Sequence, residues 1–153
     1  MVENRDKIWT RDFVTVFAVN FVMSMGQFMI NTLLPKYTYH LGGDASVVGM
    51  VTGIFAVTAL GIRPVAGPAM DYFRKNRLLT LSIGVITLSY ACFGFAGGIP
   101  MLVAARLLHG IGIGMTAPLC LALVTNNLPI GKVASGLGIF SLGTAIASAF
   151  GPS

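Results

Sequence analysis

The sequence predicts an all-α integral membrane protein, a bundle of about five transmembrane helices. Of its 153 residues, 55% are hydrophobic and only 10% are charged, whereas about a quarter of the residues in an ordinary soluble domain are charged. The apolar residues also form long runs, and a helix needs about 20 mostly apolar residues to cross the hydrocarbon core of a bilayer. A soluble chain this short has too little interior to bury so much apolar surface.

Five apolar runs meet this length, at residues 13–34, 46–70, 78–95, 101–124 and 133–153. They are separated by short segments with turn or basic residues, around positions 35 and 42–43, 74–77, 97–100 and 126–129. Because these joints are short, successive helices are expected to be antiparallel neighbours. The first run is longer than the h-region of a signal peptide and no A-x-A cleavage site follows it, so it is predicted to be retained.

The distribution of Lys and Arg predicts the orientation. Joints on alternate sides differ strongly in basic content, since Lys36 alone lies on one side and the other side carries Arg5, Lys7, Arg11, Arg74, Lys75, Arg77 and Lys132. Short loops rich in Lys and Arg stay in the cytoplasm. The N-terminus is therefore expected in the cytoplasm.

Several functions are disfavoured. The net charge of +5 comes from clusters between apolar runs, which fits membrane topology better than a nucleic-acid-binding face, so no nucleic-acid partner is expected. Cys92 and Cys120 are isolated within apolar runs, and neither a metal site nor a cofactor is implied. The chain has no HExxH, GxSxG or P-loop motif, and His40 and His109 are isolated. It is not expected to be an enzyme.

One face of the first run is polar. Asn20, Ser24, Gln27 and Asn31 follow one another at spacings of four, three and four residues, which places them within about 40° of one another on a helix. In lipid, such a face must meet other helices or water. Hydrogen bonding between helices is one explanation. We favour the other, that the four side chains line a substrate cavity.

Arg63 and Arg106 fall inside the second and fourth runs. An arginine at the centre of a membrane helix costs about 2.5–3.5 kcal/mol on insertion scales and usually faces a bundle interior or an aqueous cavity. Snorkelling to the membrane surface is the alternative. We place Arg106 in the substrate cavity.

The second run carries a stripe of small and charged residues. If the helix is regular, one arc contains Gly49, Gly53, Ala56, Arg63, Gly67 and Asp71. Small residues four positions apart allow another helix to approach closely. This stripe ends in a carboxylate at the predicted membrane surface, and basic residues follow at once.

These residues resemble motifs of the Major Facilitator Superfamily of secondary transporters. The stretch from Gly67 through Asp71 to Arg74, Lys75 and Arg77, preceded by Arg63, is similar to the motif between helices 2 and 3. Arg106, His109 and Gly110 resemble the helix-4 motif. The helix-5 motif of proton-coupled drug antiporters is similar to the last run, at Gly143, Ala147, Gly151 and Pro152.

The resemblance implies a fold of twelve helices in two halves, of which this chain supplies about five helices of the N-terminal half. It implies that the helix 2–3 motif acts as a conformational switch, that Arg106 serves proton coupling or anion binding, and that the helix-5 residues shape that helix. The expected partners are a small-molecule substrate, the lipid bilayer and the missing C-terminal half. A proton gradient is the expected energy source.

Three functions remain open. Proton-coupled efflux is favoured by the helix-5 motif. Proton-coupled uptake of a sugar or organic acid would suit the uncharged polar face of the first helix. A non-transporting membrane subunit or fragment is the third, because five helices cannot enclose a cavity between two halves. The expected location is the plasma membrane, as a multi-pass protein of the bacterial inner membrane.

Overall fold

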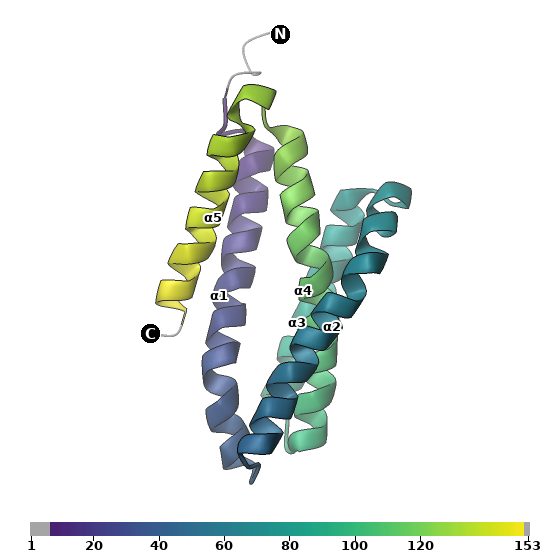
Figure 1. The fold of residues 1–153 in the computed structure, drawn as a ribbon, viewed down its shortest axis with the longest axis vertical. Helices are drawn as coiled ribbons and strands as arrows, with labels where there is room; N and C mark the ends of the chain where they lie inside the picture. The colour runs from purple at the N-terminus through teal and green to yellow at the C-terminus, as the bar shows by residue number, and fades with distance from the viewer. Residues whose placement is uncertain (1–6, 152–153) are drawn as a thin grey trace. The chain divides into compact units, whose positions relative to one another are not determined.

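The computed structural model describes residues 7–151, and all the regular structure in that range is helical. In chain order the elements are α1 (Arg11–His40), α2 (Ala45–Tyr72), α3 (Lys75–Gly94), α4 (Ile99–Asn127), the short 3-10 helix η1 (Ile130–Lys132) and α5 (Val133–Phe150) (Figure 1). Within residues 7–151, five helical segments are long and apolar enough to cross a membrane, the last joining η1 and α5. The predicted all-α membrane class is confirmed. Arg5 and Pro152 lie outside the described residues.

The first helix is longer than the sequence predicts. We expected it to end at Leu34, before Pro35, but α1 continues to His40 with Pro35 inside it. Contacts of its last turns explain the extension. The Tyr37 hydroxyl donates a hydrogen bond to the Ala96 carbonyl at 2.6 Å, and Thr38 is fully buried and donates to Leu34 O at 2.8 Å. Tertiary contacts here outweigh the cost of a proline within a helix.

Local chemistry fixes the turn between α1 and α2. Gly42 has a φ of +84°, a conformation that glycine adopts without steric cost. A Cβ on Gly43 would lie 2.8 Å from Cγ2 of Thr38, so this position has no space for a side chain. Asp44 then caps α2 by accepting a 2.9 Å hydrogen bond from the backbone N–H of Val47.

The joint between α2 and α3 is shorter than the sequence predicts. We placed residues 74–77 in the joint, but α2 ends at Tyr72 and α3 begins at Lys75, so Phe73 and Arg74 alone connect them. Lys75 and Arg77 therefore lie in the first turn of α3. Before this joint, α2 continues as one helix through Pro64 and Pro68.

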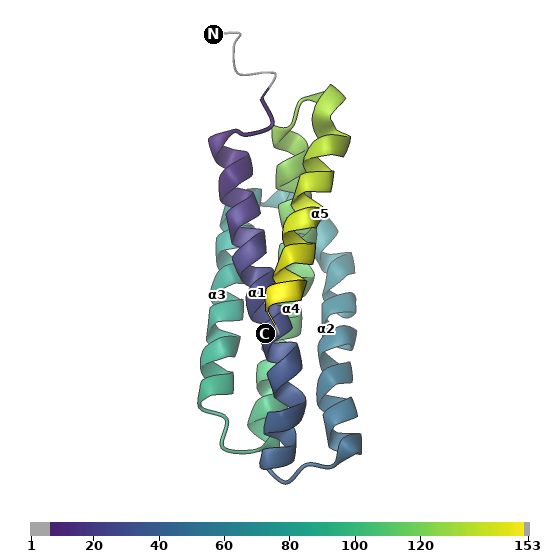
Figure 2. The ribbon, with the colours of Figure 1, turned by 90° about the vertical axis from the view of Figure 1, so that its left-hand side faces the viewer.

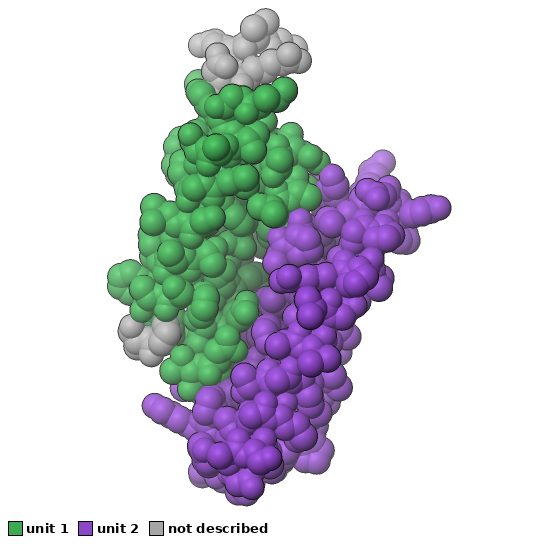
Figure 3. Space-filling view, viewed as in Figure 1, with its two compact units in different colours: residues 1–32, 120–153 green, residues 33–119 purple. Residues whose placement is uncertain are grey.

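The chain divides into two compact units, shown in Figure 3. Unit 1 comprises residues 1–32 and 120–153, and contains the first part of α1, the end of α4, η1 and α5. In this unit α1 and α5 lie side by side, as Figures 1 and 2 agree. Unit 2 comprises residues 33–119, with the end of α1, all of α2 and α3 and most of α4. One apolar cluster of unit 2 contains Leu34, Val51, Ala96 and Leu102.

Single cysteines can test the predicted orientation. Gly97 and Gly131 are both exposed, and a Cβ at either position would have open space. With Cys92 and Cys120 replaced by serine and alanine, we expect Gly131→Cys to react with an impermeant maleimide only from the cytoplasmic side. Gly97→Cys should react only from outside intact cells. The opposite pattern would refute the cytoplasmic N-terminus.

Candidate functional site

A buried cation lies among three helices of unit 2. The side chain of Arg106 on α4 is 1% exposed. Its guanidinium carbon lies 5.1 Å from the ring centre of Phe55 on α2 and 5.8 Å from that of Phe93 on α3. These distances fit cation–π contacts, each worth about 2 kcal/mol or more when desolvated. The two rings therefore offset part of the cost of placing a charge among apolar helices.

His109, one turn along α4, belongs to the same cluster. Its ring centre lies 5.1 Å from that of Phe55, 5.3 Å from Tyr90 and 6.0 Å from Phe93. Both ring nitrogens of His109 and the hydroxyl of Tyr90 are buried without a hydrogen-bond partner among the described residues. A buried polar group left in this state costs about 1–3 kcal/mol. We call Arg106, His109, Phe55, Tyr90 and Phe93 the cation cluster.

Glycines of α4 bring its neighbours close enough to form this cluster. A Cβ on Gly110 would lie 2.9 Å from the Phe55 carbonyl oxygen, and one on Gly114 would lie 2.6 Å from that of Ala59. Both contacts are with the backbone of α2. Gly112 faces α3 instead, with Ser82 O at 3.2 Å from the added atom. The helix-4 glycines thus allow α2 and α3 to pack directly on the α4 backbone.

The helix-5 residues pack against α1 within unit 1. Gly143, Ala147 and Gly151 are all buried. A Cβ on Gly143 would lie 2.6 Å from the ring of Phe17, and one on Gly151 would lie 3.0 Å from Cβ of Phe28 and 3.2 Å from Met25 O. A residue further along α5 therefore contacts a residue further along α1. The two helices run in the same direction, as the predicted topology requires.

The fit between Gly143 and Phe17 can be tested by compensation. The Phe17 ring is stacked between those of Phe13 and Phe21, at centroid distances of 6.3 and 6.5 Å, so it has little freedom to move aside. We expect Gly143→Val to lower stability by about 1–3 kcal/mol, the usual cost of overpacking. Phe17→Ala should restore much of this loss in the double variant. Losses that simply add, measured by thermal unfolding in detergent, would contradict the contact.

The four residues of the polar face of α1 differ in burial and in hydrogen bonding. Asn20 donates a 3.0 Å hydrogen bond to Oγ1 of Thr144 on α5. For Asn20, this is the hydrogen bonding between helices that we considered as the alternative to a cavity lining. Ser24 and Gln27 are half-buried, and Asn31 is exposed. A cavity-lining role for these four residues stays a prediction.

The stripe on α2 is open along its length. Gly49 and Gly53 are exposed, and a Cβ at either of them or at Gly67 would meet nothing within 4 Å. Arg63, Asp71, Arg74 and Arg77 are exposed, whereas Lys75 is half-buried. Among residues 7–151, this face therefore has room for another helix to approach.

Comparison with known proteins identifies the family. Residues 16–153 match the Major Facilitator Superfamily. The chain belongs to this superfamily. It is 29% identical over 124 residues, 81% of this chain, to the MFS-type transporter ucsD of Acremonium sp. It is 30% identical over 131 residues, 84% of this chain, to the Quinolone resistance protein NorA of Staphylococcus aureus. These matches cover 21% and 33% of the two relatives, so the chain spans a third or less of their length.

The family assignment makes this chain a multi-pass membrane protein of a transporter class. Four positions depart from the superfamily motifs; two of them are Arg74, which stands where glycine is usual, and Ala147, which replaces a glycine. Tyr72 stands where the helix 2–3 motif usually has arginine, and His109 stands where the helix-4 motif commonly has glutamine. The structure shows Tyr72 to be 90% exposed and His109 fully buried.

Sequence reasoning missed the aromatic members of the cation cluster and the α5 partner of Asn20. Phe55, Tyr90, Phe93 and Thr144 come from three helices. Aromatic residues are common in apolar helices, so nothing in the sequence distinguished these from lipid-facing ones. A threonine on a membrane helix is equally uninformative, because its hydroxyl can bond to its own helix.

Proposed function

We propose that these helices belong to a secondary transporter that exports small amphipathic molecules in exchange for protons. The observation that carries this proposal is the cation cluster. A membrane protein with a purely structural role has no evident need for a permanent cation deep within a helix bundle, whereas charges in such positions typically serve substrate or proton pathways. In the proposed cycle, Arg106 takes part in coupling.

Two further observations support the export direction. The helix-5 residues that resemble the antiporter motif form a close-packed contact with α1, through Gly143 and Gly151. In addition, a relative at 30% identity carries the name Quinolone resistance protein. From this name we extend the proposal to amphipathic substrates for the present protein. We also propose that it lies in the plasma membrane, as a protein of the bacterial inner membrane.

Uptake of a sugar or organic acid is the second candidate. The half-buried Ser24 and Gln27 and the exposed Asn31 favour it, because uncharged amides and hydroxyls suit the hydroxyl groups of a sugar. In either case a second group of helices must supply the opposite wall of the translocation path. We propose that a complementary half is the partner of this bundle.

Transport direction can be measured in vesicles of both orientations that contain the whole transporter. In everted vesicles energised with an inward-acid gradient, export predicts accumulation of a fluorescent amphipathic dye and its collapse with a protonophore. Uptake predicts instead that radiolabelled sugar or organic acid accumulates in right-side-out vesicles. Vesicles carrying Arg106→Gln serve as the control. Transport that is insensitive to the protonophore in both orientations would refute proton coupling.

Replacing Asp71 by asparagine tests the switch role of the α2 stripe. We expect Asp71→Asn to reduce transport strongly while leaving membrane insertion intact, because the exposed carboxylate would stabilise one conformation of the cycle. A coupling of about 1–3 kcal/mol shifts the ratio of states about 5- to 150-fold. The measurement is transport together with thiol accessibility from each side. Unchanged values of both would leave Asp71 as a topology signal only.

A further inference from the structure

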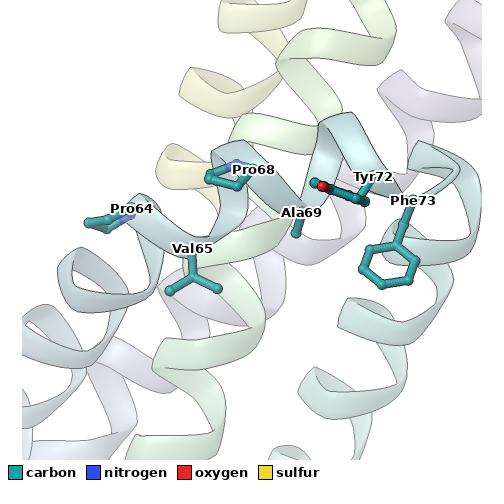
Figure 4. Close-up of a pocket in the computed structure, with 6 residues that line it drawn as sticks. All are labelled: Pro64, Val65, Pro68, Ala69, Tyr72 and Phe73. Carbon is teal, nitrogen blue, oxygen red and sulfur yellow. The ribbon is translucent and has the colours of Figure 1, made fainter.

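The cytoplasmic end of α2, as the predicted orientation places it, carries an apolar groove on its surface. The groove has a volume of about 450 Å³ and is lined by Pro64, Val65, Pro68, Ala69, Tyr72 and Phe73 (Figure 4). Tyr72 and Phe73 are 90% and 64% exposed. We call this feature the α2 groove. All of its lining residues belong to unit 2.

The α2 groove lies on a different face from the small-residue stripe. Pro64, Pro68 and Tyr72 each follow a member of that stripe by one position, which rotates them by about 100° around the helix. The stripe has open glycines, which favour the close approach of another helix. The groove is flanked instead by two large aromatic side chains, which hold a helix backbone at a distance. The two faces therefore suit different neighbours.

Basic residues adjoin one end of the groove. Arg74 directly follows Phe73, and Lys75 and Arg77 lie in the first turn of α3. Arg74 and Arg77 are exposed and Lys75 is half-buried. Three cations thus lie within a few residues of the α2 groove, at the end where Tyr72 and Phe73 lie. Tyrosine beside basic residues is typical of the boundary between hydrocarbon and headgroups.

We propose that the α2 groove binds a membrane phospholipid with an anionic headgroup. One acyl chain lies along Pro64, Val65, Pro68 and Ala69, and the phosphate lies against Arg74, Lys75 and Arg77. Charge complementarity selects this occupant, because each Lys or Arg near an anionic membrane surface contributes about 1 kcal/mol.

A reporter in line with the groove can test this inference without measuring transport. Gly61 is exposed, has open space for a Cβ, and lies one turn beyond Val65 on the same face of α2. The whole protein, with its other accessible cysteines replaced, would carry bimane on Gly61→Cys in nanodiscs. Phosphatidylglycerol with a nitroxide-labelled chain should quench it with a relative binding constant about fivefold or more above that of labelled phosphatidylcholine.

Matched variants make the outcome specific. Bimane on Gly84→Cys, an open position on α3, should show no preference between the two lipids. Arg74→Gln, Lys75→Gln and Arg77→Gln together should abolish the preference at Gly61, whereas Arg74→Lys with Arg77→Lys should keep it. Ala69→Phe, which fills the groove, should also remove it. Equal quenching by the two lipids at Gly61, or a preference that survives either Ala69→Phe or the triple glutamine variant, would overturn the proposal.

Discussion

Replacing Arg106 by glutamine is expected to lower proton-driven transport by at least about 30-fold while leaving insertion unimpaired. The guanidinium lies 5.1 and 5.8 Å from the ring centres of Phe55 and Phe93, and a loss of about 2 kcal/mol in such contacts corresponds to a factor of this size. Insertion should improve if it changes, because a buried cation opposes it by about 2.5–3.5 kcal/mol. The substitution is therefore expected to lower transport and, if anything, to favour insertion.

The lysine variant separates charge from geometry. Lysine keeps the positive charge but lacks the planar group that stacks on aromatic rings, so Arg106→Lys should recover only a small part of the transport rate. Leu107→Ala, at an exposed neighbouring position of α4, is the matched control and should transport normally. The measurement is substrate flux in proteoliposomes with an imposed pH gradient. Full activity in Arg106→Gln would exclude Arg106 from the coupling mechanism.

Adding a side chain at Gly114 is expected to separate α2 from α4 and to cause the largest loss of stability. A Cβ there would lie 2.6 Å from the carbonyl oxygen and 3.0 Å from Cα of Ala59. Both atoms belong to the helix backbone and cannot move aside as a flexible side chain can. We expect Gly114→Ala to cost about 1–3 kcal/mol, and Gly114→Leu to prevent stable folding. Midpoints of thermal unfolding in detergent give the ranking.

Gly84→Ala is the matched control for this substitution. Gly84 lies within α3, is exposed, and has nothing within 4 Å of an added Cβ. Alanine favours a helix over glycine by about 1 kcal/mol, so this variant should be as stable as the parent or slightly more stable. The same glycine-to-alanine change is thus expected to have opposite signs at positions 84 and 114. Equal effects would contradict the close packing of α2 on α4.

Part of this helical bundle was predictable because membrane helices leave a strong sequence signal. Lipid requires long apolar runs, and the five expected runs appear as five helical segments. The resemblance to the helix-5 motif likewise pointed to Gly143 and Gly151, and the structure places both against α1. Arg106 was recognisable as a charge in an apolar run.

The partners of these residues were not predictable, because they come from other helices. Nothing in the sequence connects Phe55 and Phe93 with Arg106, or Thr144 with Asn20. The stripe on α1 predicted one shared environment, but burial differs along it from Asn20 to Asn31. Which polar group finds a bonding partner depends on the neighbouring helix.

By itself the sequence determined the membrane class, the five spans found within residues 7–151 and the stripe of small residues on α2, since these depend on composition and local spacing. The tertiary structure alone decided how far α1 extends, which of the two arginines is buried and what each helix face meets. The last turns of α1 continue past Pro35 because Tyr37 bonds to Ala96 and Thr38 is buried. A proline's local cost is fixed by its covalent structure, but the contacts that outweigh it exist only after the chain has folded.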